Sequence, residues 1–305
     1  MRILFAGTPS TAATVLEGLL ASGHEVVAVL TREDALTGRK KVLTPSPVAD
    51  LTQSKGIPTI KANKLTSDVL ENIRSHKVDL AIVVAYGVIL RQEALDAIPA
   101  GWFNLHFSLL PRWRGAAPVQ AAIRIGDSET GVTLFRIDLG LDTGPVLGSA
   151  HTVIEPRENA GELLHRLSLL GLTLLNQELP RLYSGSFELT AQDGEATLAP
   201  KIIRSDAKIS FVEIAKSAEL LVRAMNPEPM AWCLFNGEPM RLLEARAVDS
   251  SSSLECGNVA LQDDKVIVGC GQGTTLELVV VQPASKTVMS ARDWLNGHSG
   301  RVVLE

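Results

Sequence analysis

A short segment near the middle of the chain, FNLHFS (103–108), places an amide and an imidazole two residues apart. On a β-strand, side chains alternate between faces, so Asn104, His106 and Ser108 would share one face. Asn104 and His106 would then lie ~6.6 Å apart along the strand, close enough to act on one small group. At a rigid strand end, this pair can hold a developing oxyanion and transfer a proton. A polar pair satisfied within the core is the alternative interpretation.

A second polar element is the turn DLGLDTG (138–144), which contains two glycines. Its Asp142 could accept an N–H from the ring of His106, which would select the tautomer of the ring and raise its basicity. Asp and Gly are also common in turns for local backbone reasons. The turn taken alone therefore also permits a purely structural interpretation.

The segment SLLPRWRGAAP (108–118) directly follows the strand predicted to carry His106. Open α/β sheets bind ligands at the carboxyl ends of their strands, which is where this loop would lie. Its Arg-Trp-Arg run (112–114) could contact carboxylates or phosphates and offer a stacking surface. A surface loop with solvated arginines is the alternative.

The elements that would position these residues alternate along the first part of the chain. Strand-like runs lie at 2–7, 24–31, 57–60, 78–86, 102–108, 130–137 and 145–154. Helical patterns lie between the early strands, at 48–55, 67–76 and 91–97, and a leucine-rich helix follows the last strand. The run VDLAIVVAY (78–86) is continuous, as expected of a central parallel strand covered on both faces. This order predicts an open, doubly wound, mainly parallel α/β sheet.

The composition and the hydrophobic pattern of the sequence change after this α/β region. Residues 190–206 are polar and aperiodic and predict a linker between a first domain at 1–189 and a second at 207–305. A helical segment at 210–225 opens the second domain. Short β-like runs separated by Gly, Asp and Ser turns follow, at 232–235, 240–248, 257–261, 265–268 and 275–281. Short strands at such spacing predict a small β-barrel.

Composition limits the classes of protein that fit. The chain is 46% hydrophobic with a net charge of −5, so it lacks the basic balance of a dedicated nucleic-acid binder. Its 3 cysteines show no CxxC spacing and indicate a reducing compartment. The sequence contains no signal-peptide pattern and no apolar run of ~18 residues. We therefore expect a cytoplasmic protein that does not contact membranes.

Two other kinds of site are disfavoured. A dinucleotide fold needs GxGxxG after its first strand, but the chain has only Gly7 of those glycines at this place. The 6 histidines and 3 cysteines show no metal-ligand spacing, so no metal is expected.

The motifs NLH (104–106), SLLPRWRGAAP (108–118) and GLDTG (140–144) resemble, in order and spacing, those of formyltransferases that use 10-formyltetrahydrofolate. Further motifs narrow the resemblance to the methionyl-tRNA formyltransferase family: FAGTP (5–9), LTPSPV (43–48), VVAYG (83–87), NPEPM (226–230), QPA (282–284) and MSA (289–291). The resemblance covers essentially the whole chain.

The resemblance implies a Rossmann-like catalytic domain followed by an OB-like, tRNA-binding β-barrel. It implies a monomer whose co-substrate is 10-formyltetrahydrofolate and whose acceptor is charged initiator tRNA, with direct acyl transfer and no acylated residue. The implied catalytic residues are Asn104, His106 and Asp142. The implied folate contacts are Ser108, Leu109, Leu110, Pro111, Tyr86, Gly87, Gly140 and Leu141. The implied tRNA contacts are Arg39, Lys40 and Lys41, which could otherwise be a solvated charge run.

The chain departs from the family pattern at Glu33, Lys40, Pro145 and Glu228, none of which belongs to the implied catalytic set. Other folate-dependent formyltransferases and formyltetrahydrofolate hydrolase share the chemistry, but a one-domain purine enzyme would not need residues 207–305. A non-catalytic nucleotide-binding or RNA-binding module is the alternative from a different class, and the intact catalytic set argues against it.

Overall fold

In a computed structural model, residues 1–38, 41–248, 253–298 and 300–305 of the chain are described. The chain divides into two compact units. The first comprises Met1–Pro118, Glu129–Val153 and Leu164–Ala199. The second comprises Val119–Ser128, Ile154–Leu163 and Pro200–Glu305. Among the described residues, no helix is long and apolar enough to cross a bilayer.

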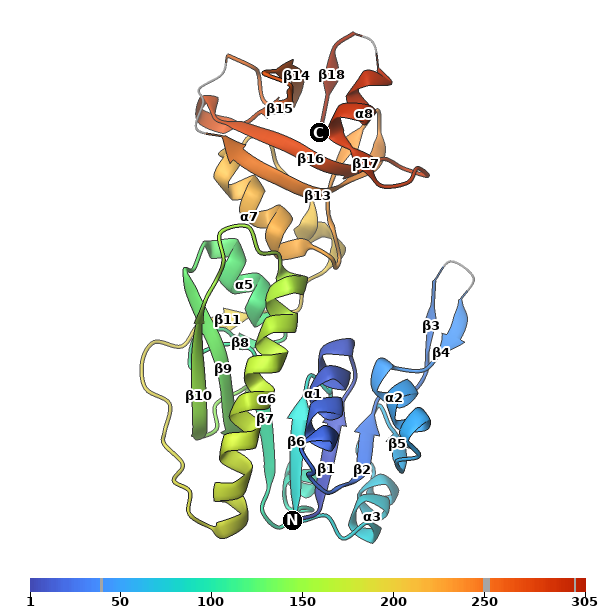
Figure 1. Cartoon of the computed structure of the whole chain (residues 1–305), viewed down its shortest axis with the longest axis vertical. Coiled ribbons are helices and arrows are strands. Elements are labelled where there is room, and N and C mark those ends of the chain that lie inside the picture. The colour runs from blue at the N-terminus through green and yellow to red at the C-terminus, as the bar shows by residue number, and fades with distance from the viewer. Residues whose placement is uncertain (39–40, 249–252, 299) are drawn as a thin grey trace. The chain divides into compact units, whose positions relative to one another are not determined.

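The first unit is built on a sheet of seven strands (Figure 1). Its parallel strands are β1 (Ile3–Gly7), β2 (Val26–Thr31), β5 (Thr59–Lys61), β6 (Leu80–Val84) and β7 (Trp102–His106). Its antiparallel strands are β9 (Glu129–Arg136) and β10 (Val146–Val153). The spatial order is β10-β9-β7-β6-β1-β2-β5. The predicted mainly parallel α/β sheet is therefore confirmed.

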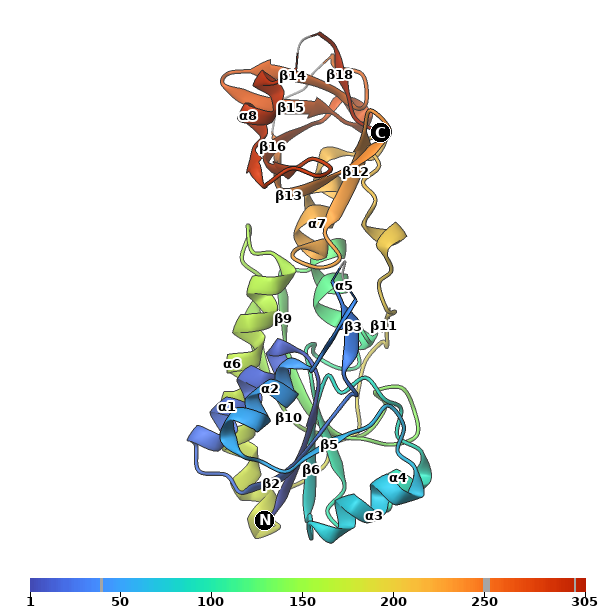
Figure 2. The same ribbon diagram turned by 90° about the vertical axis from the view of Figure 1, so that its right-hand side faces the viewer.

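Helices cover both faces of this sheet, as Figure 2 shows. One face carries α1 (Ser10–Ala21), α2 (Pro47–Lys55) and α6 (Ala160–Ser184). The other carries α3 (Ser67–Ser75) and α4 (Gln92–Leu95), whose apolar side chains form a core with alternate residues of the strands. β1 and β6 are buried along their whole length, which explains why both read as continuous apolar runs.

The two faces of β7 differ in their neighbours. On one face, Leu105 packs so closely on α6 that a Cβ added to Gly171 would meet its Cδ2 atom at 2.5 Å. On the opposite face, Trp102 belongs to the core under α3 and α4. Because strand side chains alternate, Asn104 and His106 share the face of Trp102. β7 therefore directs the amide and the imidazole to one side of the sheet at its carboxyl end.

A small hairpin lies between β2 and α2. Its strands, β3 (Ala35–Thr37) and β4 (Val42–Thr44), pair antiparallel and are mostly exposed. Strands of three residues are too short to show a hydrophobic period, so the sequence pattern did not predict them. Arg39 and Lys40 lie outside the described residues. Lys41 is exposed and has a left-handed φ of 49°.

The polar segment before residue 200 is more ordered than a linker predicted at 190–206 would be. Residues up to Ala199 belong to the first unit. The strand β11 (Leu198–Ala199) pairs in parallel with β8 (Arg114–Gly115), and Thr190 forms an isolated bridge with Val146. These contacts join segments that are 84 and 44 residues apart in sequence, so local polarity could not reveal them.

The second unit contains a curled antiparallel sheet. Its strands are β12 (Ala231–Phe235), β13 (Glu238–Val248), β14 (Asn258–Gln262), β15 (Lys265–Gly269), β16 (Thr275–Gln282), β17 (Met289–Ser290) and β18 (Val302–Val303). The main path runs β12-β13-β16-β15-β14-β18, with β17 paired to β16. An antiparallel bridge between Phe235 and Leu304 connects its two edges. The expected barrel-like second domain is confirmed.

The helices of the second unit are η1 (Arg204–Ala207) and η2 (Gly271–Gly273), which are short 3₁₀ helices, α7 (Ala215–Met225) and α8 (Ala291–Asn296). Most of α5 (Pro118–Ile125) and the first four residues of α6 also belong to this unit. α7 lies within the helix predicted at 210–225. The sequence patterns did not predict α5 or α8. The side chain of Ser290 caps α8 by accepting a hydrogen bond from the backbone N–H of Asp293 at 3.0 Å.

Candidate active site

Asn104 and His106 lie at the carboxyl end of β7, inside the sheet. Asn104 is in register with Val83 on one side and Phe135 on the other. His106 is 6% exposed, whereas Asn104 is half-buried. Among the residues that the structure describes, none hydrogen-bonds the Asn104 carboxamide. Its N–H groups can therefore donate to a ligand from a position that the two neighbouring strands hold rigidly.

A backbone carbonyl orients the ring of His106. Its Nε2 lies 2.8 Å from the carbonyl oxygen of Trp113, and because a carbonyl can only accept, Nε2 is the donor. Nδ1 lies 3.8 Å from Oδ2 of Asp142, which is too long for a hydrogen bond. Neutral His106 therefore carries its proton on Nε2 and its lone pair on Nδ1, beside Asp142.

The sequence predicts that Asp142 selects the tautomer of His106, but in the structure Trp113 does so. The reason is that the loop after β7 folds back and brings the Trp113 carbonyl to the ring. Burial lowers the pKa of His106 below its ordinary value of 6.5, while Asp142 and the Trp113 carbonyl act in the opposite direction. His106 is thus neutral at pH 7, and the carboxylate of Asp142 lies where it could stabilise an imidazolium formed by protonation at Nδ1.

The turn after β9 holds the carboxylate of Asp142 in place. Asp142 has a left-handed φ of 52°, and its Oδ2 accepts a hydrogen bond from the backbone N–H of Gly115 at 2.7 Å. Asp138 shapes the same turn, since its Oδ1 accepts from the Gly140 N–H at 2.9 Å and from the Thr143 hydroxyl at 2.6 Å. Both aspartates thus accept hydrogen bonds that fix the local backbone. Of the two, only Asp142 also lies beside His106.

Gly115 is required where β8 meets β11. Its φ is +121°, and an added Cβ would lie 2.5 Å from the carbonyl oxygen of Ala199. We expect Gly115→Ala to lower the free energy of unfolding by about 1–3 kcal/mol, because the backbone must shift. The shift would also move the N–H that holds Asp142. Denaturant unfolding measures the first effect, and turnover measures the second.

Gly185→Ala is the matched control for this substitution. Gly185 also has a positive φ, +72°, but an added Cβ would meet nothing within 4 Å. The loss of stability in Gly185→Ala therefore measures the cost of the left-handed backbone conformation without a steric contact. Equal losses of stability in both variants would contradict a role for the close approach to Ala199.

The loop that carries most of the implied folate contacts is closed by its own hydrogen bonds. Ser108 is fully buried, and its hydroxyl donates to the carbonyl oxygen of Arg112 at 2.6 Å. The hydroxyl of Thr133 donates to the Ser108 carbonyl at 2.7 Å and accepts from the Leu110 N–H at 3.1 Å. The buried Ser108 therefore holds the loop in its conformation, while Leu109 and Leu110 are half-buried and more accessible to a ligand.

The other implied folate contacts have different surroundings. Tyr86 follows β6, is 1% exposed, and donates its hydroxyl to the Ala62 carbonyl at 2.7 Å. Burial raises the pKa of Tyr86 to about 12. Its side chain therefore belongs to the core, and the next residue, Gly87, has a left-handed φ of +79°. Pro111 is buried, whereas Gly140 and Leu141 are exposed on the turn that carries Asp142.

Sequence patterns did not identify Gln192 and Thr197, which also contact the site. The side chain of Gln192 reaches both the Asp142 turn and Arg114. The hydroxyl of Thr197 accepts from the backbone N–H of Trp113 at 2.9 Å, and its carbonyl accepts from that of Arg114 at 2.9 Å. No periodicity or motif marks these two residues within their polar segment.

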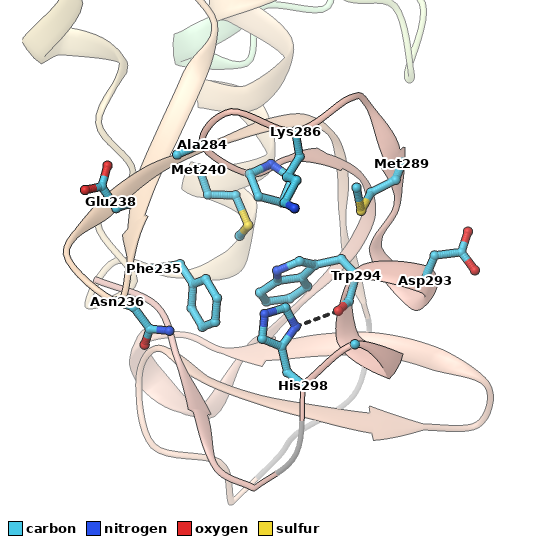
Figure 3. A pocket seen from close by; sticks show the side chains of 12 residues that line it. Phe235, Asn236, Glu238, Met240, Ala284, Lys286, Met289, Asp293, Trp294 and His298 are labelled. Atoms are coloured by element: carbon cyan, nitrogen blue, oxygen red, sulfur yellow. Dashed lines mark hydrogen bonds between the residues drawn. The ribbon is translucent and has the colours of Figure 1, made fainter.

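A separate cavity of about 530 Å³ lies in the second unit (Figure 3). Phe235, Met240, Met289 and Trp294 line it, together with His298, whose Nδ1 donates to the Trp294 carbonyl at 2.7 Å. The ring of Phe235 packs edge-on against that of Trp294, with centroids 5.2 Å apart. The residues that line this cavity include none of those grouped around His106, so it is not the candidate active site.

Comparisons with known proteins identify the family to which the chain is similar. A family model described as formyl transferase matches residues 1–179, and one described as formyl transferase, C-terminal domain, matches residues 201–299. The methionyl-tRNA formyltransferase of Corynebacterium diphtheriae is 45% identical over 303 residues, or 97% of each chain. An N-formyltransferase from Helicobacter canadensis, solved with folinic acid and dTDP-3-aminofucose, superposes with a TM-score of 0.70 at 18% identity, over 93% of this chain and 99% of its own. A methionyl-tRNA formyltransferase from Clostridium thermocellum superposes with a TM-score of 0.57 at 14% identity, over 92% and 99%.

Proposed function

Because the chain belongs to the methionyl-tRNA formyltransferase family, we propose that it transfers the formyl group of 10-formyltetrahydrofolate to the α-amino group of methionyl initiator tRNA. The product is formylmethionyl-tRNA for translation initiation. The observation that carries the proposal is the grouping of Asn104, His106 and Asp142 at the carboxyl end of β7. The strand face presents an amide donor beside a neutral base, and a carboxylate lies 3.8 Å from that base.

In the proposed reaction the neutral α-amine attacks the formyl carbon and forms a C–N bond. The formyl oxygen becomes an oxyanion, toward which the carboxamide of Asn104 can donate a hydrogen bond. Because Nε2 of His106 already donates to the Trp113 carbonyl, only Nδ1 is open to the reacting groups. Asn104 is therefore the principal oxyanion donor in this arrangement.

The proton of the attacking amine has a direct path in this site. Nδ1 of His106 takes it, and the carboxylate of Asp142, 3.8 Å away, stabilises the resulting imidazolium. When the bond between the formyl carbon and the folate nitrogen breaks, that nitrogen takes a proton, which the imidazolium can return. No residue is acylated, so the reaction needs no Ser or Cys nucleophile.

We propose the folate contacts in a revised form. The loop at Leu109–Pro111 and the turn at Gly140–Leu141 border the catalytic residues and would contact the co-substrate. Ser108 and Tyr86 would act indirectly, because their hydroxyl groups already donate to carbonyls within the protein. Gly87 would allow close approach of a ligand, because its φ of +79° favours glycine and glycine has no side chain that would obstruct the ligand.

Several broader features also belong to the proposal. The second domain would bind tRNA, the protein would act as a monomer, and its compartment would be the cytoplasm, where initiator tRNA is charged. The domain division at 1–189 and 207–305 is kept, but we assign residues 190–199 to the catalytic domain, because β11 pairs with β8.

One assay tests the proposed function. Purified protein is incubated with 10-formyltetrahydrofolate and either methionyl initiator tRNA or glycinamide ribonucleotide, and the formylated product is quantified. We expect formylation of the tRNA alone. Formylation of the ribonucleotide, or release of formate with neither acceptor formylated, would overturn the assigned acceptor. Failure of both reactions would favour a binding module.

We expect Arg39→Ala to weaken the use of aminoacyl-tRNA while folate affinity stays unchanged. The net charge of −5 gives no diffuse positive field, so RNA affinity must depend on clusters such as Arg39, Lys40 and Lys41. Each lost phosphate contact should flatten the log–log salt dependence of tRNA binding by about 0.7–0.9. The measurement is kcat/KM for tRNA across a salt series.

Arg74→Ala is the control for this variant, because Arg74 is an exposed arginine at the end of α3 and its removal changes the net charge equally. Its salt series should coincide with that of the wild type. If the Arg39→Ala series also coincides with the wild type, the cluster does not contact the RNA.

A further inference from the structure

The side chain of Gln192 uses both ends of its amide. Its Nε2 donates to the carbonyl oxygens of Asp142 and Gly144, each at 2.8 Å. Its Oε1 accepts from Nε and Nη2 of Arg114, at 3.1 and 2.6 Å. Gln192 is half-buried, and all four contacts join segments at least 48 residues away in sequence. Such a residue restrains the two segments relative to each other.

The two segments are those that hold the His106–Asp142 pair. One is the turn that carries Asp142, whose backbone has a left-handed φ of 52°. The other is the stretch 113–115, from which the Trp113 carbonyl contacts Nε2 of His106 and the Gly115 N–H contacts Oδ2 of Asp142. The Trp113 carbonyl and the Gly115 N–H, which position this pair, therefore lie on either side of Arg114, whose guanidinium Gln192 binds.

We propose that Gln192 is a positioning residue for formyl transfer, which keeps the carboxylate of Asp142 facing Nδ1 of His106. The inference rests on the proposed function. It assigns a role to the segment 190–199 beyond connecting the domains, because this segment supplies the amide. Gln192 does not touch the reacting atoms, and it acts through the backbone carbonyls of Asp142 and Gly144.

The chemistry of the contacts calls for a carboxamide. Two carbonyl oxygens require a donor, and a guanidinium requires an acceptor, so one side chain must supply both. A glutamate could still accept from Arg114, but its second oxygen would face the two carbonyl oxygens without a proton to share. A methionine has similar length and would remove both sets of contacts without adding charge.

The test uses Gln192→Met in the full chain. We expect kcat for methionyl-tRNA formylation to fall by about 10- to 100-fold, as when a catalytic group is displaced by ~1 Å. KM for 10-formyltetrahydrofolate should change less than about threefold, because the loop at Leu109–Pro111 has its own hydrogen bonds. Asp193→Asn, at the exposed neighbouring position, should match the wild type.

A double-mutant cycle separates positioning from general stability. If Gln192 acts through Asp142, Gln192→Met should cause little further loss of turnover when added to Asp142→Asn. Multiplicative losses would overturn the proposal, as would unchanged turnover in the single variant. If Gln192→Met does not fold, Gln192→Glu replaces it in the same cycle, since the interaction with Arg114 is kept.

The result is also distinguishable from failure of the proposed function. If the wild type does not formylate methionyl-tRNA, the proposed function fails before any variant is compared. If the wild type is active and Gln192→Met equals it in kcat, the function stands and the positioning role is refuted.

Discussion

Asn104→Ala is expected to lower the turnover of methionyl-tRNA formylation by about 10²–10³-fold, the usual loss when an oxyanion donor is removed. The carboxamide lies at the rigid end of β7, and no other described residue hydrogen-bonds it. Its donors are therefore ready for a charge that develops on the formyl oxygen. Single-turnover rates with saturating 10-formyltetrahydrofolate would measure the loss at the chemical step.

His106→Ala should lose turnover by a similar factor, because it removes the base that accepts the amine proton. Asn72→Ala, which changes an exposed asparagine on α3, is the matched control and should keep wild-type rates. Melting temperatures should confirm that all three variants are folded. Near-normal turnover in either Asn104→Ala or His106→Ala would remove the proposed site.

Asp142→Asn is expected to retain folate binding while turnover falls by about 10²–10⁴-fold, the range for lost acid–base assistance. An amide cannot stabilise the imidazolium of His106 as the carboxylate does. Equilibrium binding of the folate, measured beside single-turnover rates, separates the two effects. Lost folate affinity with an unchanged chemical rate would instead make Asp142 a contact of the pterin.

The pH dependence gives this substitution a second readout. Burial lowers the pKa of His106, so the neutral base persists above that pKa and is lost as the pH falls through it, below 6.5. Asp142 raises the same pKa. Its replacement should therefore move the acidic limb of the kcat/KM profile to still lower pH. A limb that stays in place would mean that His106 and Asp142 do not interact in the free protein.

Much of the fold follows from local patterns in the sequence. The strands β1 and β6 are continuous apolar runs because helices cover both faces of the sheet. Alternation along β7 places Asn104 and His106 on one face, a property of any strand. The order of the motifs was sufficient to indicate the family. These features depend on residue types and spacings within short segments, which a sequence displays directly.

The contacts that hold the site together follow from the tertiary fold and from no local pattern. The group that orients His106 is the backbone carbonyl of Trp113, and every residue type carries such a carbonyl. Gln192 reaches Arg114 across 78 residues and Asp142 across 50, from a polar segment that resembled a linker. Hydrogen bonds between distant segments leave no periodicity in the chain, because their partners meet only after the sheet and its loops have folded.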